Sequence, residues 1–224
     1  MTRAPSKSPQ LLPFVSADVA LFSVCDAALH VLLVQRGREP ARGMWALPGA
    51  ALNPEVDADL QGTALRALRE KLSVEVAHLE QVTTISGQDR DPRGFSVSVL
   101  FYALLPRDQV NAVIRSRVEA VNWTPVQARP SPLAFDHDEL LAEAVTRLRT
   151  KVESHALPLH LLPPKFTLTE LQRICEAVLG RELDKGVFRR RLRTSPDLEE
   201  VAGEFVLGAQ RPAQLYRAAA DFKF

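Results

Sequence analysis

Residues 45–74 read WALPGAALNPEVDADLQGTALRALREKLSV, a loop that turns into a helix. Pro48 and Gly49 are typical of backbone outside regular structure, so the first half of the stretch is expected to be a loop. From Asp59 to Leu72 the apolar side chains recur three and four residues apart, as they do on one face of a helix. The stretch therefore predicts a glycine-containing loop followed by an amphipathic helix over 59–72.

The flanking segments predict strands and a second helix. Before the loop, residues 15–24 first alternate between apolar and polar side chains and then become continuously apolar. Residues 29–35 form a second apolar run, so the two segments predict a strand hairpin. After the helix, residues 76–85 and 94–105 predict a strand pair, and residues 120–125 a further short strand. Residues 137–152 again carry apolar side chains at helical spacing and predict a second amphipathic helix.

Composition places the chain among ordinary globular proteins. Its 224 residues are 46% hydrophobic and 25% charged, which excludes disorder, a collagen-like repeat and a disulfide scaffold. A net charge of +1 gives no overall argument for nucleic acid, so any such argument must be local. Cys25 and Cys175 lie in apolar runs and are expected to be buried free thiols. No run approaches the roughly 18 apolar residues of a membrane span, so we expect a cytoplasmic protein.

A proline-containing stretch, residues 154–164, separates a second module with a different pattern. A helix is expected from Phe166 to Leu179, capped by Thr167 or Thr169 and ended by Gly180. Asp184 is expected to cap another helix over 185–193, and residues 204–207 and 213–217 read as two strands. Two helices followed by a two-stranded wing predict a winged helix.

The second helix of this module carries a run of basic residues with no acid among them. Phe188 and Leu192 are four residues apart and can seat the helix on a core, whereas the basic residues line another face. Such a run is often only a solvated face. In a winged helix, however, this helix enters the major groove, where arginines meet phosphates and guanine edges. The residues are Lys185, Arg189, Arg190, Arg191 and Arg193.

Residues 14–150 resemble the Nudix family. Its box reads Gly, five residues, Glu, seven residues, then Arg-Glu-hydrophobe-any-Glu-Glu-any-Gly-hydrophobe. Gly49 and Glu55 stand at that spacing, and after a small insertion Arg66 to Val74 match the second half. Residues 45–49, 89–94 and 132–138 extend the resemblance. It implies an α+β chain in which a Nudix-type α/β/α sandwich precedes the small winged helix-turn-helix domain.

The resemblance also implies that the box has lost its metal site. In Nudix enzymes the helix glutamates hold Mg²⁺ against a diphosphate, because a hard divalent ion prefers carboxylate oxygens. Here two of the three positions are Ala67 and Lys71, and only Glu70 remains. We therefore expect no catalytic residue, no metal and no cofactor. The alternative is a magnesium-dependent ADP-ribose or related pyrophosphohydrolase, in which a loop carboxylate such as Glu75 or Asp91 compensates.

Nudix domains bind nucleoside diphosphate derivatives, and arginines suit their phosphate oxygens. We expect Lys71 to supply positive charge in place of the metal; the alternative is that it is merely exposed. For His137, helix capping by Asp136 explains the sequence as well as a ligand contact does. The expected ligand-binding residues are Arg36, Arg38, Arg66, Glu70, Lys71, Arg90, Arg93, Phe135 and His137.

The tail resembles the winged helix of Nudix-related transcriptional regulators of NAD metabolism. The likeness rests on LPPKFTLTELQR (162–173), LGRELDKGVFRRR (179–191) and RPAQLYR (211–217). In that family a non-catalytic Nudix domain senses ADP-ribose or a related nucleotide, and a homodimer binds a palindromic operator. The expected DNA-binding residues are Thr169, Lys185, Arg189, Arg190, Arg191, Arg193, Arg211, Gln214 and Tyr216.

Together these features predict four segments: a flexible 1–13, a Nudix-like sensing domain over 14–153, a linker over 154–164 and a winged helix over 165–224. The leading hypothesis is a homodimeric regulator, expected to be a repressor, of NAD-metabolism genes. Its partners would be double-stranded operator DNA and ADP-ribose, NAD or a related nucleotide, with no membrane. A protein-interaction module is a third hypothesis, but it leaves the basic helix face without a role.

Overall fold

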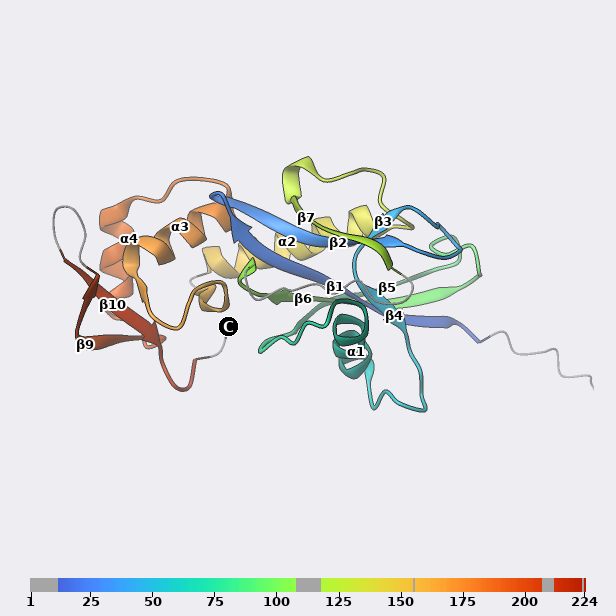
Figure 1. Ribbon diagram of the computed structural model, residues 1–224, viewed down its shortest axis with the longest axis horizontal. Coiled ribbons are helices and arrows are strands. Elements are labelled where there is room, and N and C mark those ends of the chain that lie inside the picture. The colour runs from blue at the N-terminus through green and yellow to red at the C-terminus, as the bar shows by residue number, and fades with distance from the viewer. Residues whose placement is uncertain (1–11, 108–117, 155, 207–211, 223) are drawn as a thin grey trace, which may run out of the picture.

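The computed structural model describes residues 12–107, 118–154, 156–206, 212–222 and 224. A seven-stranded mixed sheet forms the larger part of the molecule (Figure 1). At its centre β1 (Phe14–Cys25) pairs antiparallel with β2 (Ala28–Arg36) and with β4 (Gly49–Ala51), and parallel with β6 (Ser96–Leu104). The short β3 (Trp45–Ala46) and β7 (Val118–Pro125) pair with β2, and β5 (Glu80–Gly87) pairs with β6. The predicted hairpin is confirmed.

One helix covers each face of this sheet. Successive side chains of a strand point to opposite faces, so Ala17, Val19 and Leu21 of β1 pack with α1 (Leu60–Leu72). Ala20 and Phe22 of the same strand pack on the other face with α2 (His137–Glu153). The result is the predicted α/β/α sandwich, with an apolar core on each side of the sheet.

The first helix begins directly after Asp59. Asp59 is the N-cap of α1, and its side chain accepts a hydrogen bond of 2.6 Å from the Gly62 N–H. The helix ends at Ser73, whose backbone is left-handed with φ of 55°. The strand after it begins at Glu80 rather than at residue 76. Val74, Val76 and Leu79 pack against the α1 core instead, which holds the chain out of the sheet.

The winged helix forms the other part of the molecule. It comprises β8 (Phe166–Thr167), α3 (Leu168–Leu179), α4 (Lys185–Leu192), β9 (Leu198–Val206) and β10 (Ala213–Ala218), and its three-stranded sheet has the order β8-β10-β9. Thr167 and Glu170 form a capping box on α3, and Asp184 caps α4, as predicted. Strand β9 begins six residues before the predicted 204, because residues 198–200 pair with β10 as far as Ala218.

The segment from 154 to 164 does not separate two cores. It contains the short 3₁₀ helix Leu159–Leu161, and its leucines Leu157, Leu159, Leu161 and Leu162 are all buried. The same apolar cluster continues from α2 to Leu171, Cys175 and Val178 of α3. The prolines shape this stretch, but the leucines between them anchor it, so the two modules share one continuous core. A second 3₁₀ helix, Val126–Ala128, follows β7.

Both cysteines are free thiols, but only Cys175 is buried; Cys25 lies half-exposed at the end of β1. Across the described ranges, every helix is too short or too polar to cross a membrane.

Candidate functional site

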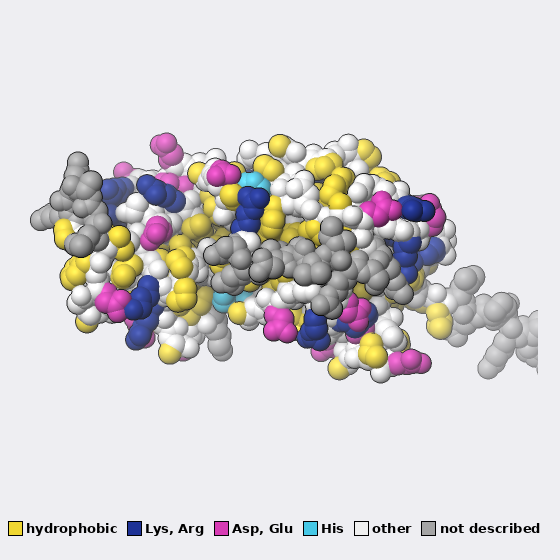
Figure 2. All heavy atoms as spheres, viewed as in Figure 1, with side chains coloured by type: hydrophobic (Ala, Val, Ile, Leu, Met, Phe, Trp, Pro, Cys, Tyr) yellow, Lys and Arg dark blue, Asp and Glu magenta, His cyan; other side chains and the backbone are white. Residues whose placement is uncertain are grey.

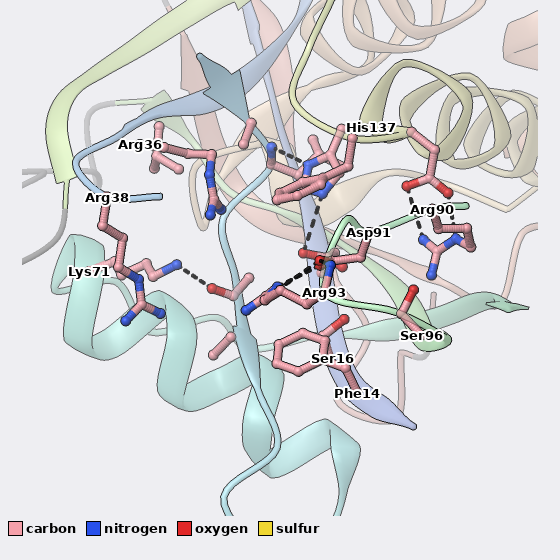
Figure 3. Close-up of a pocket in the computed structure, with 18 of the residues that line it drawn as sticks. Phe14, Ser16, Arg36, Arg38, Lys71, Arg90, Asp91, Arg93, Ser96 and His137 are labelled. Carbon is pink, nitrogen blue, oxygen red and sulfur yellow. Dashed lines mark hydrogen bonds and ion pairs between the residues drawn. The ribbon is translucent and has the colours of Figure 1, made fainter. Parts of the chain in front are cut away.

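A pocket opens where the central strands meet the loop between β5 and β6 and the start of α2 (Figure 3). Strands β1, β2 and β4 supply its floor and one wall, the C-terminal end of α1 contributes Lys71, and Arg90, Asp91 and Arg93 come from the loop. The pocket collects seven of the nine expected ligand-binding residues: Arg36, Arg38, Lys71, Arg90, Arg93, Phe135 and His137. Sequence segments more than a hundred residues apart therefore meet at one site.

His137 and Asp18, both residues of the pocket lining, belong to a buried polar cluster. The Leu47 N–H donates to His137 Nδ1 at 2.9 Å. Because an accepting ring nitrogen carries no proton, we assign the proton to Nε2, which lies 3.8 Å from Asp18 Oδ1. The other Asp18 oxygen accepts a 2.5 Å hydrogen bond from Ser98 Oγ. Burial lowers the pKa of His137, so the ring is neutral near pH 7.

His137 is thus a buried support of the pocket as well as part of its lining. The alternative explanation, capping by Asp136, is not what the structure shows. Asp136 stands at the N-cap position of α2, but its side chain makes no capping hydrogen bond. Its carboxylate is held by Arg90 instead, through bonds of 2.6 and 3.0 Å.

Gly49 allows the loop to lie directly on β1. A Cβ at this position would lie 2.0 Å from Asp18 Oδ1 and 2.8 Å from the backbone oxygen of Ala17. No side chain fits in that space, so the first residue of the Nudix-like box is a packing requirement.

The arginines of the pocket fall into two groups. Arg90 is neutralised by Asp136, and Arg93 by Asp91 through bonds of 2.8 and 2.5 Å. The Arg93 guanidinium also lies over the Phe14 ring, 3.8 Å from its centroid. Hydrogen bonds from Arg93 lower the pKa of Asp91, so this carboxylate is ionised and committed to its partner.

Arg36 lies on the opposite side of the pocket. Arg36 donates to the Pro40 oxygen at 2.9 Å and lies 4.7 Å from the Phe135 ring centroid, and none of the described carboxylates pairs with it. Burial lowers its pKa, and the nearby Arg93 and Arg38 cations add to that effect. Figure 3 shows Arg38 and Lys71 on the same side. An anion bound there would relieve repulsion among these cations.

Phe135 takes an uncommon backbone conformation at this wall. Its φ is +58°, in the left-handed region, which large side chains seldom adopt. This places its ring beside Arg36 and 5.7 Å from the His137 ring. The wall therefore offers a flat aromatic face next to a guanidinium plane, a surface on which a planar ring can stack.

Arg66 and Glu70 lie outside the pocket, unlike the sequence expectation. Arg66 donates to both oxygens of Asp57 at 2.7 Å, and to the Ala51 oxygen at 2.9 Å. The Asp57 side chain is 2% exposed, and hydrogen bonding to Arg66 holds its pKa well below the usual range. Glu70 is exposed and pairs with Arg66. These residues fix the loop to α1, and the acidic partner within the box is Asp57 rather than the exposed Glu55.

The residues of this site do not fit a magnesium ion. Lys71 Nζ donates to the Gly49 carbonyl oxygen, at a box position where the enzymes have a carboxylate. Among the described residues, no group of three His, Cys, Asp or Glu side chains is arranged to hold a metal. Neither compensating carboxylate serves: Asp91 is engaged by Arg93, and Glu75 is exposed beside Arg69.

The second site is the exposed face of α4. Figure 2 shows lysine and arginine side chains on the part of the molecule that carries α3 and α4, as well as on the part formed by the large sheet. Lys185, Arg189, Arg190 and Arg193 are exposed, whereas Phe188 and Leu192 are buried beneath them, as predicted. Arg189 reaches the start of α3, where it donates a 3.4 Å hydrogen bond to Thr169.

Three expected DNA-binding residues do not lie on that face. Arg191 is half-buried, one of its terminal nitrogens is enclosed by protein, and burial lowers its pKa. Gln214 donates to the backbone oxygens of Val201, Glu204 and Leu215, and so stays inside the wing. Tyr216 pairs with Phe166 in the small sheet and packs on the core. Arg211 lies outside the described residues.

Sequence reasoning missed several residues of the pocket. Asp18, Phe14 and Ser96 line it from strands that were predicted only as strands. An acidic residue inside the apolar run of β1 was a usable signal, because a buried carboxylate needs partners. Phe14 and Ser96 had no comparable signal, because only the parallel pairing of β1 with β6 brings them together.

Comparison with known proteins assigns both parts. Residues 16–144 match the NUDIX domain model, and residues 158–218 match the NrtR DNA-binding winged helix domain. The chain is 43% identical over 221 residues to the ADPR responsive transcriptional repressor NtrR of Acinetobacter baylyi, covering 97% of this chain and 88% of that protein. The chain belongs to the NrtR family. This confirms the predicted pairing of a Nudix domain with a winged helix.

Solved structures of NrtR proteins agree. Shewanella oneidensis NrtR complexed with a 27mer DNA superposes with a TM-score of 0.79 at 37% identity, covering 92% of this chain and 93% of that one. The NUDIX domain of the same NrtR, complexed with ADP ribose, gives a TM-score of 0.55 at 36% identity, covering 64% and 94%. Related chains have thus been solved with each of the two ligand classes expected here.

Proposed function

We propose that this protein is a transcriptional repressor that binds operator DNA through α4 and binds ADP-ribose in the Nudix pocket, which changes its affinity for DNA. The observation that carries the proposal is that one NrtR-family chain contains both a cation-rich pocket and an exposed basic helix. As a repressor it would act in the cytoplasm, where the bacterial chromosome lies, and a homodimer would match the two halves of a palindromic operator.

The pocket chemistry suits ADP-ribose. Arg36, Arg38 and Lys71 can bind the diphosphate, because guanidinium and ammonium groups complement phosphate oxygens. The Phe135 ring beside Arg36 offers a stacking face for the adenine. Lys71 stands at a lost glutamate position and touches the Gly49 oxygen, so its ammonium replaces a metal ion as the local cation.

Removing the Lys71 charge tests this site. Lys71→Met keeps the aliphatic stem, and we expect a loss of about 10-fold or more in ADP-ribose affinity, the usual worth of a charged hydrogen bond. Arg69→Met is the control, because Arg69 lies on the same helix, exposed and outside the pocket. Isothermal titration calorimetry measures both. Equal affinity in Lys71→Met and the unmodified protein contradicts this role for Lys71.

Metal removal separates the repressor from the hydrolase alternative. We expect ADP-ribose to bind with the same affinity in Mg²⁺ and in EDTA, and chromatography to detect no AMP after prolonged incubation with Mg²⁺. The Ala67→Glu, Lys71→Glu double variant, assayed alongside, should gain magnesium dependence of binding. Magnesium-dependent turnover by the unmodified protein would favour the hydrolase.

DNA binding is tested with fragments upstream of the chain's own gene and of NAD-synthesis genes. We expect submicromolar, salt-dependent binding to at least one fragment, with two protomers per site by sedimentation. Binding that shows no preference over random DNA, or a protein that stays monomeric on the operator, would contradict the proposal.

A further inference from the structure

Helix α2 connects the two sites directly. Its first residue, His137, lines the pocket, and Asp136 just before it holds Arg90 of the pocket wall. Arg149 lies twelve residues further along the helix (149 − 137 = 12), a rise of about 18 Å. Figure 1 shows α2 running from the large sheet to α3.

At that far end Arg149 contacts the DNA-binding part. Its Nε donates a 3.0 Å hydrogen bond to the Val178 carbonyl oxygen in the last turn of α3. Carbonyls in a last turn lack partners within the helix and carry partial negative charge, so a guanidinium is favourable there. Gly180 ends α3 with φ of +69°, and a Cβ at that residue would lie 3.6 Å from the Arg149 Nη2 atom. Arg149 therefore fits closely against the end of α3.

Near Arg149, α2 and α3 also pack on each other through apolar side chains, but this packing does not fix the position of one helix along the other. Leu141, Ala144 and Leu148 of α2 share one cluster with Cys175 and Val178 of α3. Packed side chains of this kind resist separation yet permit small shifts between helices. The polar bond from Arg149 to the backbone of α3 fixes the position of one helix along the other. Phe224, which packs on Tyr102 and His78, ties the two parts together independently.

We infer that Arg149 is the positioning residue that couples the ligand pocket to the DNA-binding helix by transmitting displacement of α2 to α3. The displacement begins at the start of α2, because Asp136 and His137 line the pocket that receives the ligand and Asp136 is bonded to Arg90 of the same pocket. Because α3 packs on α4 through the shared core, its shift reorients the exposed arginines. This inference rests on the proposed function and concerns its regulation.

The test measures a coupling factor, the ratio of operator dissociation constants with and without saturating ADP-ribose. In Arg149→Met the aliphatic stem remains but the donor is lost. We expect the coupling factor to move at least threefold toward one. The ADP-ribose affinity and the operator affinity without ligand should each stay within about twofold of those of the unmodified protein. By linkage, the effect of operator on ADP-ribose affinity must fall by the same ratio.

Two further variants make the test specific. Arg147 lies on the same helix, but its side chain pairs with Glu80 of the large sheet. The coupling factor of Arg147→Met should therefore be unchanged. Arg149→Lys can still donate to the Val178 oxygen and should recover at least half of the lost coupling on a logarithmic scale. It also serves as the test variant if thermal melting shows that Arg149→Met is unfolded.

The outcomes are distinct. An unchanged coupling factor in Arg149→Met, or one that Arg149→Lys fails to recover, overturns the inference. Loss of ADP-ribose affinity in Arg149→Met with an intact fold also overturns it, because Arg149 would then act on the pocket itself. Failure of the unmodified protein to respond to ADP-ribose at all would instead refute the proposed function.

Discussion

Arg189 and Arg190 should set the salt dependence of DNA binding, and Arg191 should not. The three are consecutive in sequence, but the helix turns the first two to solvent and Arg191 toward Phe188, where its guanidinium carbon lies 6.0 Å from the ring centroid. A cation contributes to the salt dependence only if it neutralises a phosphate and releases a counterion. The prediction therefore depends on the orientation seen in the structure.

The magnitude follows from counterion release. Each phosphate contact contributes about 0.9 to the slope of log affinity against log salt, so the double variant Arg189→Gln, Arg190→Gln should lose about 1.8 per protomer. A fourfold rise in salt would then change affinity about 12-fold less per protomer than in the unmodified protein. Arg191→Met keeps the packing and should leave the slope within about 0.3.

Fluorescence anisotropy of labelled operator at four salt concentrations gives the slopes. Thermal melting of each variant is the control, because a partly unfolded winged helix would also bind weakly. An unchanged slope in the folded double variant would refute the assignment of α4 to phosphate contacts. A slope that falls as much in Arg191→Met would show that the orientation of α4 differs from the one described.

Further predictions concern the pocket and pH. Gly49→Ala should lower the free energy of unfolding by about 1–3 kcal/mol and abolish ADP-ribose binding, because its Cβ would lie 2.8 Å from the Ala17 oxygen of the central strand. Urea unfolding measures the stability and calorimetry the binding. A variant that binds ADP-ribose normally would contradict the close packing of Gly49 on β1. Burial lowers the pKa of His137 below 6.5, so the native state binds fewer protons than the unfolded state, and stability is retained above pH 6.5 and lost below it. For His137 the free energy of unfolding changes by at most about 1.4 kcal/mol per pH unit. His78 and His160, whose pKa values burial also lowers, add smaller contributions because solvent screens them. Urea midpoints that stay constant between pH 7.5 and 5.5 would contradict it.

Local patterns predicted the elements of this fold well. The helical spacing around Leu68 and Leu141 and the caps Thr167 and Asp184 depend on neighbours in sequence, so they are visible there. Strand pairing is different, because the parallel contact of β1 with β6 joins residues about eighty positions apart. The burial of residues 157–162 likewise depends on a core that only the folded chain assembles.

The sites were predicted less completely, for reasons that specific residues show. Arg191 follows Phe188 by three residues and therefore shares its helix face, a signal that counting charges in the run ignores. Asp57 was overlooked because Glu55 satisfied the box spacing, although the insertion shifts the chain so that Asp57 meets Arg66. In both cases residue type alone does not determine the geometry of the motif.

The central claim, that ADP-ribose in the Nudix pocket controls DNA binding by α4, is tested most directly by one titration. Labelled operator is titrated with the full chain by fluorescence anisotropy at fixed salt, without ligand and with saturating ADP-ribose. We predict specific binding without ligand and a change in dissociation constant of at least fivefold with ADP-ribose, within the usual range of allosteric coupling. Identical binding curves in the two conditions, with ADP-ribose binding confirmed by calorimetry, would contradict it.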